Sequence, residues 1–294
     1  MQHTSDPNTN LAEAGTIQLE LMRLSQLTGD PIYAYTANEA INTIITMPYG
    51  IPGLKPMSLD ASKAVFQGDT VTFGGGGDSY YEYLLKSWML SGQTLPSLVE
   101  SWQDAITSAQ KYMPSSPVGF ANISWLASLE GTTQVPSEQE LLCFLPGNVL
   151  MGAKLLSNQA FATFAEQLMQ ACSEAWNTPT GLASEVWDWV PARPGDHTTP
   201  ASKSTKLPFN KRGYEIFSAI KKNCRLEVGY SSISDVTQGP SGGYKNLQDS
   251  YFFAETLKYS YLLFSPTSTI SLNDWVFNTE SHPMKLSTSY LIQA

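Results

Sequence analysis

The sequence contains few charged residues, since Asp, Glu, Lys and Arg make up only 15% of its 294 residues, against about a quarter in typical soluble domains. The 17 basic residues are outnumbered by 26 acidic ones, which gives a formal net charge of −9. Proteins that bind nucleic acid or anionic membranes neutralise phosphates with Lys and Arg. The shortage of basic residues therefore argues against nucleic acid and against a membrane surface as partners.

Long apolar runs are also missing. No stretch approaches the roughly 20 apolar residues of a membrane span, and the opening MQHTSDPNTNLAEAG lacks the basic and apolar regions of a signal peptide. The three cysteines are too few for a disulfide-rich scaffold, and their odd number leaves at least one thiol unpaired. Aromatic residues, in contrast, are plentiful, with 7 Trp, 14 Tyr and 12 Phe. The composition indicates an acidic, aromatic-rich globular chain.

Apolar spacing predicts helices that follow one another in pairs. The pairs are expected at 11–27 with 32–46, at 79–90 with 97–112, and at 148–156 with 159–175, followed by single helices at 211–223 and 249–264. Strand-like segments are short, as at 70–73 and 275–280. Because the alternation of strands and helices typical of α/β folds is missing, the pattern favours an α/α toroid or an α-solenoid.

One segment, Pro191–Gly213, does not fit this pattern. It is polar, rich in proline and free of apolar periodicity. A structureless run of this length is uncommon in a compact domain. We interpret it as a flexible insertion or as sequence foreign to the surrounding fold.

Four consecutive glycines, Gly74–Gly77, precede the expected helix at 79–90. A phosphate loop would need a lysine at the helix start, whereas this run is followed by Asp78, which would repel phosphate. Ser79 and Glu82 match the capping box, in which a hydroxyl and a carboxylate satisfy backbone N–H groups at a helix start. Asp78 would add favourable charge at the positive end of the helix dipole.

The capping box does not explain the glycines themselves. Without side chains, they would let a bulky ligand approach the backbone beside Asp78. Carboxylates accept hydrogen bonds from hydroxyl groups, and aromatic rings such as those of Tyr80, Tyr81 and Tyr83 pack on the C–H faces of sugars. The segment therefore suits a sugar site, and a flexible turn is the alternative.

Further acidic residues lie near the C-terminal end. Glu255 shares a helical face with Tyr251 and Tyr259, which suits a carboxylate lining a pocket, although an ion pair with Lys258 is an equally open interpretation. Thr279 and Glu280 interrupt an apolar stretch in FNTESHP and are either part of a site or a surface turn.

The motifs together resemble glycoside hydrolase family 47, the class I α-1,2-mannosidases of N-glycan trimming. The segments AEAGTIQLELMRLSQLTGDPIY, GGGGDSYYEYLLKSW, LLCFLPGNVLMGA, YFFAETLKYSYLLF and DWVFNTESHP occur in the family's order and are most similar to fungal members. The resemblance implies an all-α fold, the (α/α)7 barrel, present here in part from residue 1 to 294. It also implies an inverting mechanism and a calcium ion, which prefers oxygen ligands.

The resemblance assigns roles to individual residues. Asp78 matches a catalytic carboxylate, and the main-chain carbonyl and hydroxyl of Thr279 match the calcium ligands. The residues expected to contact mannose are Glu20, Glu255, Glu280 and Tyr251, the last replacing a usual phenylalanine; for Glu20 a solvated acid between core leucines is an open alternative. Cys143 and Cys172 match the structural disulfide of the family, which implies an oxidising compartment and leaves Cys224 as the spare thiol.

Several positions depart from the family pattern. The usual general-acid glutamate belongs to a part of the barrel that precedes AEAGTIQLE and is absent from this chain. The glutamate of an Arg-Pro-Glu segment, expected as the base, is replaced by Gly195 within the Pro-rich segment. Glu140 stands where the family has a histidine, and Gly76 stands where many relatives have an arginine.

These observations predict a calcium-dependent α-1,2-mannosidase of the secretory pathway, acting on high-mannose oligosaccharides or N-glycoproteins and impaired in this truncated chain. The alternative is a non-catalytic mannose-binding protein of glycoprotein quality control that keeps the calcium pocket. An incomplete gene product without function, or a generic α-solenoid scaffold, are further alternatives.

Overall fold

The computed structural model describes residues 7–120, 123–193, 196 and 209–286 of the chain. Its α-helices are α1 (Leu11–Gly15), α2 (Gln18–Thr28), α3 (Ile32–Thr46), α4 (Asp78–Leu90), α5 (Pro96–Tyr112), α6 (Leu145–Leu155), α7 (Gln159–Ala175), α8 (Phe209–Cys224) and α9 (Lys258–Leu263). Shorter 3₁₀ turns are η1 (Glu140–Phe144) and η2 (Gly239–Gly242), and a π-helical turn is η3 (Phe252–Leu257).

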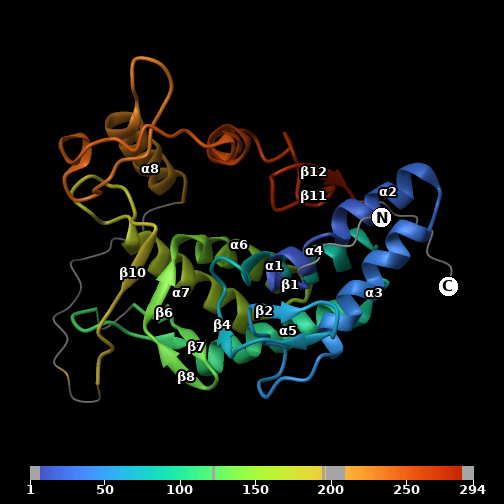
Figure 1. Ribbon diagram of the computed structural model, residues 1–294. Coiled ribbons are helices and arrows are strands. Elements are labelled where there is room, and N and C mark those ends of the chain that lie inside the picture. The colour runs from blue at the N-terminus through green and yellow to red at the C-terminus, as the bar shows by residue number, and fades with distance from the viewer. Residues whose placement is uncertain (1–6, 121–122, 194–195, 197–208, 287–294) are drawn as a thin grey trace.

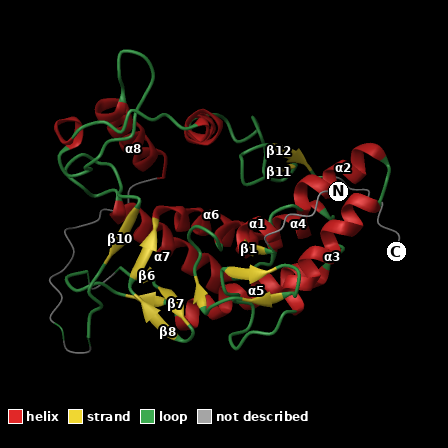
Figure 2. Cartoon of the chain, in the orientation of Figure 1, coloured by secondary structure: helices red, strands yellow, loops and turns green. Residues whose placement is uncertain are grey.

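The strands are short and form small antiparallel sheets at the edge of the helices (Figure 2). They are β1 (Asn8–Asn10), β2 (Ser58–Asp60), β3 (Val65–Phe66), β4 (Thr70–Val71), β5 (Pro114–Ser115), β6 (Trp125–Leu126), β7 (Ser128–Glu130), β8 (Thr133–Val135), β9 (Ser137–Gln139), β10 (Val186–Asp188), β11 (Trp275–Phe277) and β12 (Pro283–Lys285). The sheet orders are β1-β2-β3 and β4-β7-β8, and the pairs are β5-β6, β9-β10 and β11-β12.

The predicted helix pairs are present. α2 packs on α3, α4 on α5, and α6 on α7, so that helices adjacent in sequence are also neighbours in space. Local signals set several of their ends: the Asn158 side chain accepts a hydrogen bond from the main chain of Phe161 at the start of α7, and Gly29 ends α2 in the left-handed conformation that glycine adopts without strain. The sequence pattern therefore identified these pairs, although the single helix expected at 11–27 is divided into α1 and α2.

Helix α4 lies at the centre of the helical body (Figure 1) and contacts α1, α2, α5, α6 and β11. All its residues from Ser79 to Leu90 are buried. Its apolar residues belong to two clusters of the core, one around Tyr80, Tyr81 and Leu84 and a smaller one that joins Tyr83 to residues of α2, α3 and β11. Because α4 is buried on all sides, the core holds it in one place, and with it Asp78, the residue at its start.

The C-terminal part differs from this body. Residues 249–264, expected to form one helix, form the π turn η3 followed by the α-helix α9. Neither element contains a buried residue. Strand β11 returns to the helical body and packs against α4. The chain after α9 therefore lies beside the N-terminal helices again, where Val276 of β11 joins the cluster of Leu19 and Met22.

The Pro-rich segment Pro191–Gly213 lies largely outside the described residues, which exclude 194–195 and 197–208. Pro191 pairs with Pro117 in an isolated bridge, and the chain is already helical from Phe209, where α8 begins. Gly195 falls outside the described residues. Among the residues that are described, no helix is both long and apolar enough to cross a lipid bilayer.

Candidate active site

Asp78 is the first residue of α4 and the only acid in its first turn. Its Oδ1 accepts a hydrogen bond from the Ser79 main-chain N at 2.7 Å, as expected of an acid at the positive end of a helix. Burial raises the pKa of the Asp78 carboxyl, and the neighbouring Glu82 carboxylate raises it further. A carboxyl group with a raised pKa can keep its proton to higher pH, which suits acid catalysis.

The capping box predicted for Ser79 and Glu82 is wrong. The helix begins one residue earlier, with Gly77 as its N-cap and no side chain capping it. Ser79 Oγ instead accepts a hydrogen bond from Thr16 Oγ1 at 2.8 Å. Glu82 forms a buried ion pair with Lys86. Because Asp78, Glu82 and Lys86 are spaced four residues apart, they lie along one face of α4.

The glycine run has a packing reason at its last position. A Cβ atom on Gly77 would lie 2.3 Å from the carbonyl oxygen of Thr72, a main-chain atom that has no freedom to move aside. The main-chain N–H groups of Gly77 and Asp78 both donate to the Gly74 carbonyl oxygen, at 3.1 and 3.0 Å. The run thus forms a tight turn that leads directly into Asp78, and its role in admitting a sugar stays a prediction.

Glu20, from α2, joins the residues after β11 through a hydrogen-bond network. Its Oε1 accepts from the Tyr83 hydroxyl at 2.8 Å and from Asn278 Nδ2 at 2.9 Å. The Tyr83 hydroxyl in turn accepts from the Thr279 main-chain N at 3.2 Å. Burial, followed by the charge of Glu20, raises the pKa of Tyr83. The second oxygen of Glu20, Oε2, is buried and has no partner in the protein.

Glu255 lies in the π turn η3 and faces the same region. Burial raises the pKa of its carboxyl, and the charges of Glu280 and Glu82 add to that effect. Since Glu82 also acts on Asp78, the carboxylates of α4, η3 and the segment after β11 influence one another. Lys258 makes no direct ion pair with Glu255, although its charge lowers the pKa of that carboxyl; its Nζ donates to the Ser281 carbonyl oxygen at 2.8 Å.

Tyr251 lies at the border of this group. Its side chain is exposed, and its hydroxyl donates to Asp249 Oδ2 at 2.8 Å. That bond, with smaller contributions from burial and nearby acids, raises the pKa of Tyr251 to about 12. The structure therefore ties its hydroxyl to Asp249 and leaves about half of the side chain exposed, and its contact with a sugar stays a prediction.

Some residues of this region were missed by sequence reasoning. Asn278 precedes the expected Thr279 directly and could have been found by its place in FNTE, since its side chain also accepts from the main-chain N–H groups of Glu280 and His282. Lys86 could have been found by its spacing, because it follows Glu82 by four residues, the arrangement of a helical ion pair. Glu138, a buried acid of β9 that interacts with Asp78, had no such signal.

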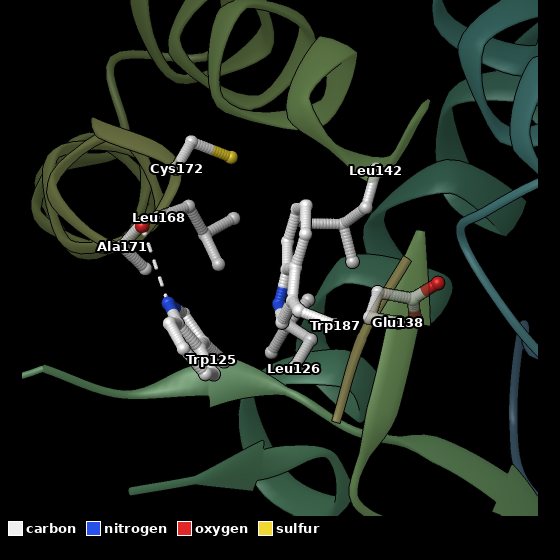
Figure 3. Close-up of a pocket in the computed structure, with 8 residues that line it drawn as sticks. All are labelled: Trp125, Leu126, Glu138, Leu142, Leu168, Ala171, Cys172 and Trp187. Carbon is white, nitrogen blue, oxygen red and sulfur yellow. Dashed lines mark hydrogen bonds between the residues drawn. The ribbon is translucent and has the colours of Figure 1, made fainter. Parts of the chain in front are cut away.

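The predicted disulfide between Cys143 and Cys172 is confirmed, and Cys224 is free. The bond ties η1 to α7 beside a small apolar hollow whose lining includes Trp125, Leu168 and Trp187 (Figure 3). Trp125 Nε1 donates to the Ala171 carbonyl oxygen at 3.2 Å. The hollow is a gap in the apolar packing next to the disulfide, and we assign it no part in the candidate site.

The carboxylates do not by themselves form a metal centre. In the part of the chain that the structure describes, no group of three or more His, Cys, Asp or Glu side chains is placed to hold a metal ion. Thr279 offers its main-chain carbonyl and hydroxyl oxygens, and Glu20 Oε2, which belongs to the same hydrogen-bond network, is buried without a partner. A set made only of oxygens, with water completing it, is of the kind that calcium accepts.

Comparison with known proteins places this geometry in context. The chain is 36% identical over 301 residues to "Mannosyl-oligosaccharide 1,2-alpha-mannosidase MNS1" of Arabidopsis thaliana, a match covering 94% of this chain and 52% of that protein. It is 32% identical to human "Mannosyl-oligosaccharide 1,2-alpha-mannosidase IC", with 97% of this chain and 48% of that protein covered. The chain thus spans about half the length of these two relatives.

A solved structure of an α-1,2-mannosidase from Trichoderma reesei superimposes with a TM-score of 0.88 at 28% identity, over 97% of this chain and 68% of that one. This likeness confirms the expected (α/α)7 barrel, present here in part. A D-mannose isomerase, with a TM-score of 0.55 and 12% identity, shares the fold alone. The model of "Glycosyl hydrolase family 47" matches residues 1–208 and 202–286, and the chain therefore belongs to glycosyl hydrolase family 47.

Proposed function

We propose that this chain forms the mannose-binding part, with one catalytic carboxyl group, of a calcium-dependent inverting α-1,2-mannosidase. Its substrates would be high-mannose oligosaccharides or N-glycoproteins that carry terminal α-1,2-linked mannose. The relatives that match nearly the whole chain are named for this activity, which supports the same chemistry here.

The observation that carries the proposal is the network around Glu20. It joins α2, α4 and the segment after β11, three parts of the chain that are far apart in sequence. One buried oxygen of Glu20 lacks a partner, and a buried carboxylate oxygen without a hydrogen bond is costly. A sugar hydroxyl or a water bound to a cation would satisfy it.

The donors present fit calcium, with Thr279 as the direct ligand and the nearby carboxylates acting through water. Calcium, when bound, would fix the hydroxyl groups of the terminal mannose. Glu20, Glu255 and Glu280 would accept hydrogen bonds from those hydroxyls, and the exposed ring of Tyr251 would pack on a sugar face.

Asp78 would supply one of the two carboxyl groups that an inverting glycosidase needs. It stands at the start of a fully buried helix, which holds it in a fixed place. Its raised pKa suits a group that donates a proton to the leaving oxygen.

We expect turnover by this chain to be impaired. Gly195 stands where the family resemblance places a glutamate that acts as the base. Without a base to activate water, the reaction would lose a contribution of about 10² to 10⁴ in rate.

A second candidate function is calcium-dependent mannose binding without hydrolysis, as in glycoprotein quality control. The Glu20 network favours it, because this network needs neither Gly195 nor any other residue of the Pro-rich segment. The disulfide supports a place in an oxidising compartment such as the secretory pathway for either function.

Product analysis tests the proposal. The chain is incubated with calcium and the methyl glycoside of α-1,2-mannobiose, whose leaving group has no free anomeric centre, and the anomer of the released mannose is read by proton NMR before it equilibrates. Slow release of β-mannose supports the inverting mannosidase, and release of α-mannose contradicts it. Binding without release favours the second candidate.

A matched pair of variants tests the calcium ligand. Thr279→Val should weaken calcium binding at least tenfold in a calorimetric titration, because it removes an oxygen donor. Thr36→Val is the control, since Thr36 is an exposed residue of α3 whose hydroxyl donates to the Ile32 carbonyl oxygen of the same helix. Equal calcium affinity in both variants would remove Thr279 from the site.

A further inference from the structure

Glu138 is a buried acid to which the proposed mechanism gives no role. It lies in β9 with 3% of its surface exposed. Its carboxylate accepts hydrogen bonds from Thr72 Oγ1 at 3.1 Å, from Ser128 Oγ at 3.2 Å and from the Gln139 main-chain N at 3.0 Å. Figure 3 shows Glu138 at the edge of the apolar hollow, on the side opposite Trp125.

The Thr72 hydroxyl links Glu138 to the glycine run. Its oxygen accepts a hydrogen bond from the Gly74 main-chain N at 2.8 Å while its proton points to Glu138. The Gly74 carbonyl oxygen then accepts from the Asp78 main-chain N at 3.0 Å. A continuous set of hydrogen bonds therefore runs from Glu138 through Thr72 and Gly74 to Asp78.

Gly74 also makes room for this acid. A Cβ atom on Gly74 would lie 2.5 Å from Glu138 Oε1, so a larger residue here would force this carboxylate out of its hydrogen-bonded position. The next residue of β9 holds the next glycine, since Gln139 Oε1 accepts from the Gly75 main-chain N at 2.9 Å. Strand β9 thus fixes two successive glycines of the turn that leads into Asp78.

We propose that Glu138 is a positioning residue for Asp78, acting through Thr72 and Gly74 on the turn that starts α4. The inference rests on the proposed function in taking Asp78 as the catalytic acid. A shift of about 1 Å in a catalytic group can cost about a hundredfold in rate. A buried residue that holds the glycine turn in place would therefore protect the rate by keeping Asp78 in position.

The charge state of Glu138 is consistent with this role. Burial raises its pKa to about 7, with a smaller contribution from the charge of Asp78. The groups that face it from β7 and from the chain after β4 are the neutral hydroxyls of Ser128 and Thr72, so Asp78 of α4 is the charge acting on it. As pH falls below about 7 Glu138 becomes mostly uncharged, so it anchors the turn through its hydrogen bonds and not through charge.

Hydrogen–deuterium exchange tests the anchor without requiring activity. In Glu138→Met, which keeps a side chain of similar size, the amides of Gly74 and Asp78 should exchange about tenfold faster than in the wild type, because their hydrogen bonds lose support. Glu138→Gln keeps an acceptor oxygen and should exchange like the wild type. The control is Glu130→Met, where an exposed acid of β7 loses a bond from Thr70 Oγ1 at 2.7 Å.

A second pair of variants guards against misfolding of Glu138→Met. Thr72→Val removes only the hydroxyl and should speed exchange at Gly74 and Asp78, whereas Thr72→Ser should restore the wild-type rate. Exchange that is unchanged in both Glu138→Met and Thr72→Val would overturn the proposal.

Asp78 itself supplies the readout that separates positioning from a general effect on stability. In Glu138→Met the pKa of the Asp78 carboxyl, followed by carbon-13 NMR, should fall towards its ordinary value as water reaches the loosened turn. If the wild type hydrolyses mannobiose, kcat should also fall about tenfold or more with KM changed less than about twofold. A wild type without activity would count against the proposed function alone, since exchange and the Asp78 titration still decide the role of Glu138; an unchanged Asp78 pKa would refute it.

Discussion

Two helical segments contribute to the candidate site, and they differ sharply in packing. Every residue of α4 from Ser79 to Leu90 is buried, whereas η3 and α9 contain no buried residue. Asp78 stands at the start of the first segment and Glu255 lies within the second. The exposed side of the second segment is aromatic, with Phe253 57% and Tyr261 66% accessible.

This difference in burial shows that the core holds the half of the site around Asp78 more firmly than the half around Glu255. Asp78 and the Glu20 network are fixed by α4 and its neighbours, and they need no ligand to stay in place. Glu255 is held by little more than its short π turn and the segment around Ser281. Segments with few buried contacts open locally at a low cost in free energy, so we expect the half of the site around Glu255 to depend more on a bound ligand for its order than the half around Asp78 and Glu20.

The largest effect expected within α4 is on catalysis. Asp78→Asn should reduce any hydrolysis of α-1,2-mannobiose by about 10² to 10⁴, because an amide cannot donate the proton. Mannose release by the variant and the wild type, measured at equal protein concentration, gives the ratio. A variant that keeps full activity would transfer the catalytic role away from α4.

Removal of the disulfide tests the packed body next. The bond closes a loop with a sequence separation of 29 between Cys143 and Cys172, for which the chain-entropy relation gives about 3–4 kcal/mol of stability. Replacing both cysteines by alanine should lower the free energy of unfolding in urea by that amount. A loss below about 1 kcal/mol would show that the body does not rely on this bond.

A matched pair of leucine substitutions measures the contrast directly. Leu84→Ala in α4 removes a side chain with no exposed surface and should cost about 3 kcal/mol of stability. Leu263→Ala in α9, where the side chain is 42% exposed, should cost about 1 kcal/mol. Equal losses in urea unfolding would mean that α9 is packed as tightly as α4, contrary to this account.

The smallest effect concerns pH. Because burial raises the pKa of Glu138 from its ordinary 4.5 to about 7 in the folded protein, the folded state holds, between these pH values, a proton that the unfolded state has lost. The stability it contributes is present at acid pH and is lost as pH rises through 7, by about 2 kcal/mol between pH 5 and 7. Glu138→Gln cannot ionise and should lack this loss, so the difference in unfolding free energy between variant and wild type should grow over this interval. A constant difference would contradict the raised pKa.

Much of the fold follows from the sequence because the helix pairs carry regular apolar spacing and clear ends. The family segments also gave the disulfide pair in advance, whereas the roles that they assign to Asp78 and Thr279 stay predictions. The start of α4 was predicted wrongly, since Ser79 and Glu82 satisfy a local motif that tertiary contacts override: Thr16 bonds Ser79, and Lys86 pairs with Glu82 inside the core.

Other features had no local signal at all. The bond of Asn278 to Glu20 joins residues 258 apart in sequence, and no periodicity predicts such a pairing. The break of the expected helix at 249–264 into a π turn and an α-helix was also invisible, because its aromatic residues satisfy either geometry. The anchor formed by Glu138 depends on β9 lying beside the glycine turn, which only the folded chain shows.

Calorimetric titration of α-1,2-mannobiose into the wild type and into Glu20→Gln, each with calcium and with a chelator, tests the central claim that the Glu20 network is a calcium-dependent mannose site. The account predicts binding by the wild type that requires calcium and is weakened at least tenfold in Glu20→Gln, since the variant loses the unpartnered carboxylate oxygen. Binding of equal strength with the chelator, or in Glu20→Gln, would contradict it.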